Sequence, residues 1–580
     1  MKKTMMITLS ALACQVMAAS EITVEKPYFR WLWGGFGFQN SEANLTALMP
    51  DDFLNERVLK TFAELSPTFG RVYTGFAEQS KEQLDRFADY YDKTFRKAGT
   101  TLYAVPCGMP AIREGDDPRA YAEKVAKNLE YLVKVRDCRK LRFYCLSNEL
   151  MVGDSWDWFS RSGKMDLYKA YNEALYDAFR AHGLDIKILA TDKAVTTKPD
   201  QVFESLDWAR TNMNDVVGAY CSHWYVYGRR TDELCLWKEY NAYFDKLVQL
   251  ALKTQKRFIL GEYGFHPSFG KRGVMQDDVS YHLRQPETAA ESVLCKCELA
   301  LAAFANGAFA AVNWSFVDYP DPFVIEDGHT PEERLAYEAG KCGYKLDHKY
   351  NKCGLFRWGS VDRDYSSYHE LYAMGHLVRL FRKGATVLPC KTEDDMLRPA
   401  AAFNRDRSVT IAVINRGDAR EVTVDCGGWQ PRTDGRPSLH QPLRRYVYDS
   451  ANVPFNAFND LQPHAETIVA AGDRFTVTLP AKSMTFFTTD YVDRVPAKVE
   501  GVRVAAARGA PETGGCGGNV CGTSSFRLVW TATKDPDHRY YRVYRDGKQI
   551  ASTVATSLAV GSAKGTYSVK SVDKWLNVGD

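Results

Sequence analysis

The sequence predicts a multidomain α/β plus all-β protein, with a (β/α)8 TIM barrel first, then a β-sandwich, then a smaller β-sandwich. Short apolar runs alternate with amphipathic helical stretches from residue 29 to about residue 384, which gives a series of strand–helix units with eight predicted strands. Such a series is typical of a barrel of parallel strands surrounded by helices. From about residue 385 the apolar residues follow a period of two, which indicates strands with one buried face.

The barrel is predicted for residues 21–384, and its elements follow from local patterns. The apolar runs predict strands at 29–38, 69–76, 100–106, 141–147, 186–191, 216–224, 257–262 and 308–316. The amphipathic stretches predict helices at 80–98, 117–137, 164–182, 200–213, 231–254, 288–306 and 367–382. A doubly wound sheet is the competing fold, but no glycine-rich phosphate turn follows the first run. The barrel is therefore favoured.

Two all-β regions follow the barrel. Alternating segments at 409–414, 421–424, 475–479 and 484–487 predict a β-sandwich over residues 385–492. The last region, 497–580, carries Trp530 in an early strand, a YRVYRDG hairpin and a SVDKWLNVG tail. On these features it resembles a fibronectin type III module, and the resemblance implies a fibronectin III-like β-sandwich.

The charge balance excludes one class of partner. The chain has 75 basic and 72 acidic side chains and a net charge of +3. Because no basic excess is available to neutralise a phosphate backbone, we expect no nucleic-acid partner. Cysteine and histidine residues show no zinc-like spacing, so we expect no metal and no cofactor.

The first 20 residues are predicted to be a signal peptide. Lys2 and Lys3 precede an apolar stretch from Met5 to Ala13 that is too short to span a bilayer. We therefore expect a secreted or periplasmic protein. Cys14 leaves open a lipid anchor at the cell surface. No other stretch reaches the length of about 18 apolar residues that a membrane helix needs, so we expect no integral membrane segment.

Two glutamates stand where a barrel carries its chemistry. Glu149 follows the fourth predicted strand, and Glu262 follows the seventh. Because the carboxyl ends of barrel strands build the active face, both side chains should project into the same mouth. A pair of carboxyl groups about 5–5.5 Å apart supports double displacement at a sugar carbon. One of them must be protonated and the other ionised, and their surroundings can separate their pKa values.

The residues at these strand ends resemble those of clan A retaining glycoside hydrolases. The matching residues are Asn148-Glu149, Glu262, Arg71, the His223-Trp224-Tyr225 motif and Trp314. The resemblance covers residues 29–384. The segment 372–377 and the following sandwich are similar to the glucosylceramidase/xylanase-type and β-xylosidase-type families of the clan. Leu150 stands where proline is commoner, which leaves the particular family open.

The resemblance also implies roles for these residues. Glu149 would be the acid/base, and Glu262 would be the nucleophile. Tyr225 would steady Glu262, and Arg71 would keep it ionised. Substrate contacts would come from Asn148, which would bind the sugar 2-hydroxyl, from His223, and from Trp314, which would form the floor of the cleavage subsite.

Further substrate-binding candidates lie near the predicted strand ends. They are Trp156, Trp158, Trp33, Glu42 and Tyr263. Together with the two glutamates they predict an enzyme, a retaining glycoside hydrolase that acts on a poly- or oligosaccharide and is expected to be a β-glycosidase. The alternative is a catalytically inactive glycan-binding protein on the same barrel. Two intact glutamates argue against that alternative.

Overall fold

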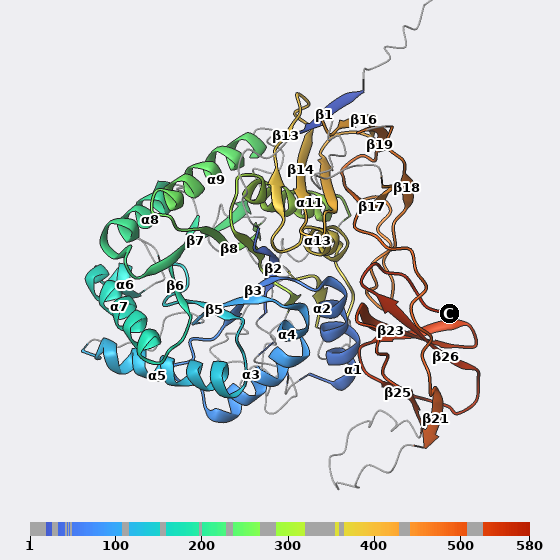
Figure 1. Ribbon diagram of the computed structural model, residues 1–580, viewed down its shortest axis with the longest axis horizontal. Helices are drawn as coiled ribbons and strands as arrows, with labels where there is room; N and C mark the ends of the chain where they lie inside the picture. Colours follow the sequence, from blue (N-terminus) through green and yellow to red (C-terminus); the bar gives the residue numbers. More distant parts are fainter. Residues whose placement is uncertain are drawn as a thin grey trace, which may run out of the picture.

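The computed structural model describes residues 19–25, 33–40, 43, 46, 49–106, 115–150, 158–195, 200–227, 236–266, 286–318, 354–358, 365–427, 441–471, 473–506 and 526–580. Its largest feature is a closed barrel of eight strands, which neighbour one another in chain order (Figure 1). Every neighbouring pair of barrel strands is parallel. The predicted barrel is thereby confirmed.

The barrel strands lie close to the eight apolar runs. They are β2 (Gly35–Gln39), β3 (Phe69–Tyr73), β4 (Thr101–Val105), β5 (Leu141–Cys145), β6 (Lys187–Val195), β7 (Val217–Tyr227), β8 (Phe258–His266) and β9 (Ala310–Asn313). Three of them, β6, β7 and β8, continue past the ends of the runs that predicted them. This extension carries additional side chains to the carboxyl-terminal rim.

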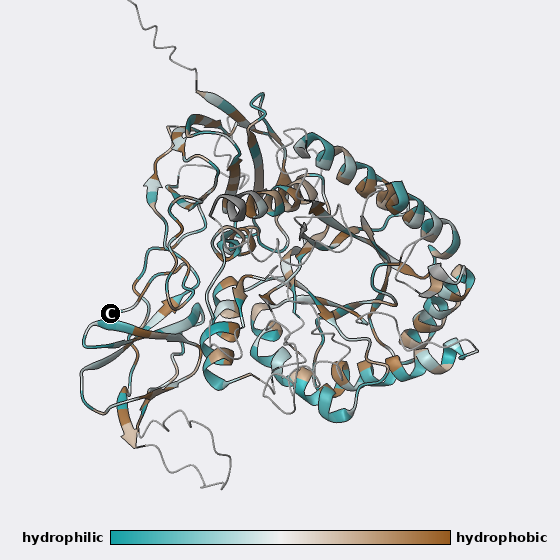
Figure 2. Cartoon of the chain, turned by 180° about the vertical axis from the view of Figure 1, so that it is seen from behind, coloured by the Kyte–Doolittle hydropathy of each residue, from teal (hydrophilic) through white to brown (hydrophobic). Residues whose placement is uncertain are grey.

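Helices surround the barrel. They are α3 (Lys81–Lys93), α4 (Phe95–Ala98), α5 (Pro118–Glu130) with η4 (Tyr131–Val135), α6 (Trp158–Arg161), α7 (Met165–Ala181), α8 (Asp200–Met213), α9 (Leu236–Leu252) and α11 (Pro286–Ala305). Helix α3 begins with a capping box, because the Ser80 hydroxyl accepts from the Gln83 backbone N–H and the Gln83 side chain accepts from the Ser80 N–H. Apolar residues lie on the inner faces of the ring helices and polar residues on the outer faces (Figure 2). Among the described residues, no helix is both long enough and apolar enough to cross a bilayer.

The helical segment between the first two strands was not predicted. It consists of α1 (Asp51–Phe53), η3 (Leu54–Val58) and α2 (Leu59–Leu65). Its residues are buried on several sides because α2 also packs against α13 (His369–Leu380) and the carboxyl-terminal module. A helix that is covered in this way lacks the one-sided apolar pattern of a surface helix.

The sandwich consists of two sheets. The first has the order β12 (Thr386–Leu388), β14 (Leu397–Phe403), β15 (Val409–Asn415), β20 (Ser483–Thr488), β17 (Leu443–Asp449) and β18 (Glu466–Ile468). The second has the order β13 (Cys390–Lys391), β1 (Ser20–Val24), β16 (Arg420–Asp425) and β19 (Arg474–Leu479). A core that includes Ile411, Val424 and Phe487 joins them.

Strand β1 corrects the expected start of the barrel. Ser20–Val24 runs parallel to β16 and antiparallel to β13, so these residues belong to the sandwich although the sequence placed residues 21–24 in the barrel. Helix α13 is buried throughout, and α11 is almost wholly buried over residues 292–305; both helices lie between the barrel and the sandwich and contact both (Figure 1). The short strands β10 (Val317–Asp318) and β11 (Phe356–Arg357) pair beside the barrel.

The carboxyl-terminal module has two antiparallel three-stranded sheets. They are β21 (Arg503–Ala506), β22 (Phe526–Val529) and β25 (Ser557–Val560), and β24 (Lys548–Thr553), β23 (His538–Arg545) and β26 (Tyr567–Asp573). Trp530, Tyr541 and Val543 pack between them. The module is thus a small β-sandwich.

A buried group of charged and polar side chains joins the three parts of the chain. We call Lys60, Glu64, Asp460, Tyr540 and Arg542 the junction cluster. Lys60 Nζ lies 2.9 Å from Glu64 and 2.7 Å from Asp460, and the Tyr540 hydroxyl donates to Glu64 at 3.1 Å. Arg542 Nε lies 3.2 Å from Asp460. The cluster therefore fixes the module against α2 and the sandwich.

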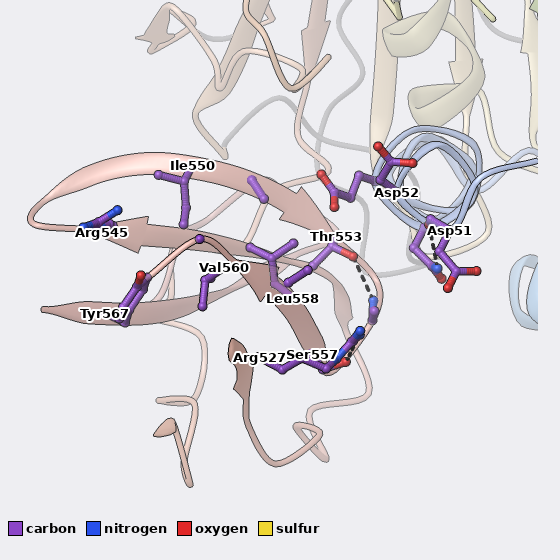
Figure 3. Close-up of a pocket in the computed structure, with 16 residues that line it drawn as sticks. Asp51, Asp52, Arg527, Arg545, Ile550, Thr553, Ser557, Leu558, Val560 and Tyr567 are labelled. Atoms are coloured by element: carbon purple, nitrogen blue, oxygen red, sulfur yellow. Dashed lines mark hydrogen bonds between the residues drawn. The ribbon is translucent and has the colours of Figure 1, made fainter. Parts of the chain in front are cut away.

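A cavity of about 460 Å³ lies between the α1–η3 segment and the carboxyl-terminal module (Figure 3). Asp51 and Asp52 line one side, and Leu558, Val560 and Tyr567 of the module line the other. Among the described residues that line it, none belongs to the predicted site.

Candidate active site

Arg71 is the centre of a buried polar group at the carboxyl-terminal end of the barrel. It lies on β3, with no exposed surface. Its Nη1 donates to Glu262, and its Nη2 donates to Asn148 and, at 3.0 Å, to Asp192. Burial opposes the charged form, but the neighbouring tyrosines and carboxylates hold the pKa of Arg71 well above its ordinary value. Arg71 is therefore a permanent cation in the barrel mouth.

Glu262 on β8 is held by three donors. Its side chain is 4% exposed. Besides Arg71, the Tyr225 hydroxyl donates to Oε1 and the Tyr73 hydroxyl lies 3.4 Å from Oε2. The preceding Gly261 accepts from the Tyr103 hydroxyl at 2.7 Å, and a Cβ at position 261 would lie 2.7 Å from that same oxygen. A side chain at position 261 would therefore collide with Tyr103, which explains the glycine at this position.

Glu149 lies in the loop after β5 and faces the imidazole of His223. Its backbone has a φ of +56°, in the left-handed region, and its side chain is 26% exposed. His223 Nδ1 lies 3.1 Å from Glu149 Oε1, while His223 Nε2 lies 2.9 Å from Asp192 Oδ1. Asp192 and His223 are fully buried. The imidazole thus stands between two carboxylates.

The charges around His223 determine which of these side chains carry a proton. Burial opposes the cationic form of His223, but Asp192, Glu262 and the hydrogen bonds raise its pKa to about 10. Burial likewise opposes ionised Asp192, yet His223 and Arg71 lower its pKa to about 2. At neutral pH Asp192 is therefore an anion and His223 a cation.

The two glutamates lie close together in unlike surroundings. One carboxylate oxygen of each and a ring nitrogen of His223 all lie within 4.8 Å of one another. Burial raises the pKa of Glu262 above its ordinary value. Burial acts on Glu149 in the same direction, but the hydrogen bond and charge of His223 hold its pKa below the ordinary value. From the sequence, Arg71 was expected to keep Glu262 ionised. That expectation did not include burial, which has the larger effect on the pKa of Glu262.

Glu149, His223 and Glu262 are also placed as a possible set of metal ligands. The chemistry of the set does not suit a cation. Arg71 already contacts Glu262, and the positive charge of its guanidinium would repel a metal ion.

Trp314 follows β9 and contributes an aromatic surface to the same end of the barrel. It is half-buried, and its ring lies 5.1 Å from that of Tyr73 at an angle of 60°. Tyr73 in turn contacts Asn148 and Glu262. The structure thus brings together seven of the predicted residues, which are Arg71, Asn148, Glu149, His223, Tyr225, Glu262 and Trp314.

Two predicted substrate contacts are wrong. Trp33 precedes β2, so it lies at the amino-terminal end of the barrel, where it packs against Phe36 and Phe304 with ring centres 4.5 and 5.0 Å away. Tyr263 is buried in the apolar core, and burial raises its pKa. Since successive side chains of a strand point to opposite faces, Tyr263 points outward where Glu262 points inward.

Three further candidates cannot be placed. Glu42 and Trp156 lie outside the described residues, as does the side chain of Trp158.

Two residues of the site were not predicted from the sequence. Asp192 comes directly after the fifth apolar run, so it lies near the end of its strand, as the two glutamates do. Tyr73 lies two residues after Arg71, and strand alternation places it on the same face. Both signals were present in the sequence.

Comparison with known proteins gives no relative by sequence. No protein-family model matches the chain, and no curated protein matches it. Solved structures do match in shape. The bacterial orthologue of human α-L-iduronidase has a TM-score of 0.53 at 16% identity, covering 97% of this chain and 98% of its own.

Two other similar structures are SrfJ from Salmonella typhimurium and the glycoside hydrolase family 30 subfamily 8 xylanase Xyn30A from Clostridium acetobutylicum. SrfJ has a TM-score of 0.51 at 15% identity and covers 82% of this chain and 93% of its own. Xyn30A has a TM-score of 0.50 at 15% identity and covers 81% of this chain and 99% of its own. At these identities the likeness establishes the architecture, and the chain shares with these proteins the fold of a (β/α)8 barrel accompanied by β-sheet domains.

Proposed function

We propose that this chain is a retaining glycoside hydrolase of the clan A type, in which Glu262 is the nucleophile and Glu149 the acid/base. The observation that carries the proposal is the position of two carboxylate oxygens, one from each glutamate, within 4.8 Å of one another. Retaining enzymes place their carboxyl groups about 5–5.5 Å apart, whereas inverting enzymes need about 6.5–9.5 Å to admit a water. The close pair supports direct attack by a carboxylate.

In the first step a Glu262 oxygen attacks the anomeric carbon while the bond to the leaving oxygen breaks. Arg71, Tyr225 and Tyr73 hold the Glu262 carboxylate in one orientation for this attack. A proton reaches the leaving oxygen through Glu149, whose side chain is 26% exposed. In the second step Glu149 accepts a proton from water, and that water displaces Glu262 from the sugar.

Asn148 and Trp314 are proposed to bind the sugar. Because Arg71 engages the amide oxygen of Asn148, the amide nitrogen is the group left to donate to a sugar hydroxyl. Trp314, which is half-buried beside Tyr73, provides an aromatic ring at this end of the barrel, and such rings suit the C–H surfaces of a sugar. The similar structures include a xylanase and an α-L-iduronidase orthologue, which supports a carbohydrate substrate of the poly- or oligosaccharide class.

We also propose that the protein is exported. Residues 1–20 would serve as the signal peptide and give a secreted or periplasmic protein, and a lipid at Cys14 would be the alternative route to the cell surface. The carboxyl-terminal module is proposed to be fibronectin III-like, and the buried junction cluster supports a fixed rather than a mobile attachment.

A panel of chromogenic glycosides tests the hydrolase. Wild type should release the chromophore from at least one β-glycoside, while Glu262→Ala and Glu149→Gln should lose at least about a hundredfold in kcat/KM. Glu421→Gln, on the exposed face of β16, is the matched control and should match wild type. If wild type and Glu262→Ala show the same background on every glycoside, the hydrolase is excluded and a glycan-binding protein remains.

A further inference from the structure

We propose that Asp192, His223 and Glu149 act as one chain, in which His223 stores the proton that Glu149 delivers to the leaving group. Asp192 is its positioning residue, which holds the imidazole in place from behind. This inference rests on the proposed function and extends it from a single acid to a relay of three side chains.

The geometry of the chain is directional. His223 Nε2 lies 2.9 Å from Asp192 Oδ1, and His223 Nδ1 lies 3.1 Å from Glu149 Oε1. Asp192 and His223 have no exposed surface, whereas the Glu149 side chain is 26% exposed. Glu149, which receives the hydrogen bond of Nδ1, is therefore the exposed end of this chain.

The surrounding charges favour storage of the proton on the imidazole. Three carboxylates face this region: Asp192 from β6, Glu149 from the loop after β5, and Glu262 from β8, whose Oε2 lies 3.8 Å from His223 Nδ1. Arg71 from β3 supplies one positive charge. A protonated His223 supplies the second positive charge, which leaves one net negative charge instead of two.

Glu149 by itself is a poor proton store. His223 holds the pKa of Glu149 below its ordinary value, while the pKa of His223 is raised to about 10. At neutral pH the pair thus holds one proton, and that proton lies mainly on the ring. Glu149 in this environment therefore needs His223 in order to donate a proton.

The relay conserves protons and charge. As the glycosidic C–O bond breaks, Glu149 passes one proton to the leaving oxygen, and Nδ1 of His223 gives one proton to Glu149. Neutral imidazole remains, with its proton on Nε2, the nitrogen that lies 2.9 Å from Asp192 Oδ1. In the second step, the proton that Glu149 accepts from water returns to Nδ1.

The backbone presents Asp192 for this role. The pairing of β6 with β7 shifts register between Thr191 and Lys193, and Asp192, with a φ of +57°, is the extra residue at this bulge. Bulges redirect side chains next to active sites. Here the bulge allows one carboxylate to contact both Arg71 and His223.

Asp192→Asn tests the relay through its dependence on the leaving group. The probes are two aryl glycosides of the sugar that the chromogenic panel identifies, one with phenol and one with 2,4-dinitrophenol as the leaving group. Phenol needs a proton to leave and dinitrophenol does not. For the phenyl glycoside we expect kcat/KM to fall about a hundredfold and its alkaline limb to move to lower pH by at least about one unit.

For the dinitrophenyl glycoside, kcat/KM of Asp192→Asn should fall far less, because this parameter reports the first step, in which this substrate needs no acid. A general loss of site geometry would lower kcat/KM equally for both substrates. Asp185→Asn, an exposed carboxylate paired with Arg142, is the matched control and should leave both pH profiles unchanged.

His223→Gln is the second variant, and it keeps the inference testable if Asp192→Asn folds poorly. Its amide still donates to Glu149 but has no proton to give, so the same difference between the two leaving groups is expected. Equal losses on both substrates, or an unchanged alkaline limb with the phenyl glycoside, would overturn the relay. A wild type that hydrolyses neither substrate would overturn the proposed function instead.

Discussion

Arg71 donates to Asp192 across 3.0 Å, and both side chains are fully buried. The same guanidinium contacts Glu262, so one cation from β3 joins carboxylates from β6 and β8. Removing one partner of a buried ion pair leaves an uncompensated charge, which costs several kcal/mol. The arginine that orients the proposed nucleophile therefore also stabilises the barrel.

Arg71→Gln should lower both stability and activity. We expect the free energy of unfolding to fall by about 3–5 kcal/mol, because two buried carboxylates lose their cation. Urea denaturation measures this loss, and kcat/KM should fall at least about a hundredfold. Arg142→Gln is the control, since Arg142 and Asp185 form an exposed pair, and it should cost about 1 kcal/mol or less. Equal losses in the two variants would refute the role given to Arg71.

Tyr225→Phe should lower kcat without unfolding the protein. The change removes the hydroxyl that donates to Glu262 Oε1, and we expect kcat to fall about ten- to a hundredfold. Tyr121→Phe is the control, because its buried hydroxyl bonds to that of Tyr144, outside the site. It should change stability by about 1 kcal/mol and leave kcat at the wild-type value. A normal kcat in Tyr225→Phe would contradict the proposed support of the nucleophile.

Stability should depend on pH through His223. Its pKa is about 10 in the folded chain, against about 6.5 in an unfolded chain. Because the folded value is raised, the stabilisation is fully present below pH about 6.5 and is lost as the pH rises through 10. The free energy of unfolding of wild type should therefore fall over this range relative to His223→Gln. Parallel pH dependences in urea denaturation would show that His223 is not protonated in the folded chain.

Activity should be lost in acid at a higher pH than an ordinary glutamate would give. Burial raises the pKa of Glu262, and the proposed nucleophile must be ionised. The acidic limb of kcat/KM should thus lie above about 4.3, the value of a solvated glutamate. The pH profile of the chromogenic reaction measures this limb. A limb at or below that value would show that Arg71 and Tyr225 outweigh burial.

The junction cluster should couple the stability of the module to that of the barrel. Lys60→Met leaves Glu64 and Asp460 buried without their ammonium partner, so we expect a loss of about 3–5 kcal/mol. Lys238→Met is the control, because Lys238 and Asp395 form an exposed surface pair at 2.8 Å, and its effect should be small. If the two variants unfold at the same urea concentration, the cluster does not hold the parts together.

The sequence predicted the barrel well because its signals are local. Apolar runs and amphipathic stretches recur in order, and the described helices from α3 to α13 lie within or near their predicted ranges. Strand β1 was misassigned because its partner, β16, lies about 400 residues away. Pairing over such a distance leaves no local pattern, so nearness along the chain was a poor guide there.

The sequence predicted those site residues that stand where an apolar run marks the end of a strand. Glu149 and Glu262 follow apolar runs, and the barrel topology brings them together. Asp192 was missed because β6 continues through a bulge beyond its apolar run. Trp33 and Tyr263 were wrong because nearness to a strand does not determine which end or which face a side chain occupies.

The most direct test of the account is covalent trapping of Glu262. A 2-deoxy-2-fluoro derivative of the sugar that wild type hydrolyses, with dinitrophenol as the leaving group, slows both steps because fluorine disfavours the oxocarbenium-like transition state. Mass spectrometry of the digested protein should then find one glycosyl label, on Glu262. Hydrolysis of the parent glycoside with no label, or a label on another residue, would contradict the account.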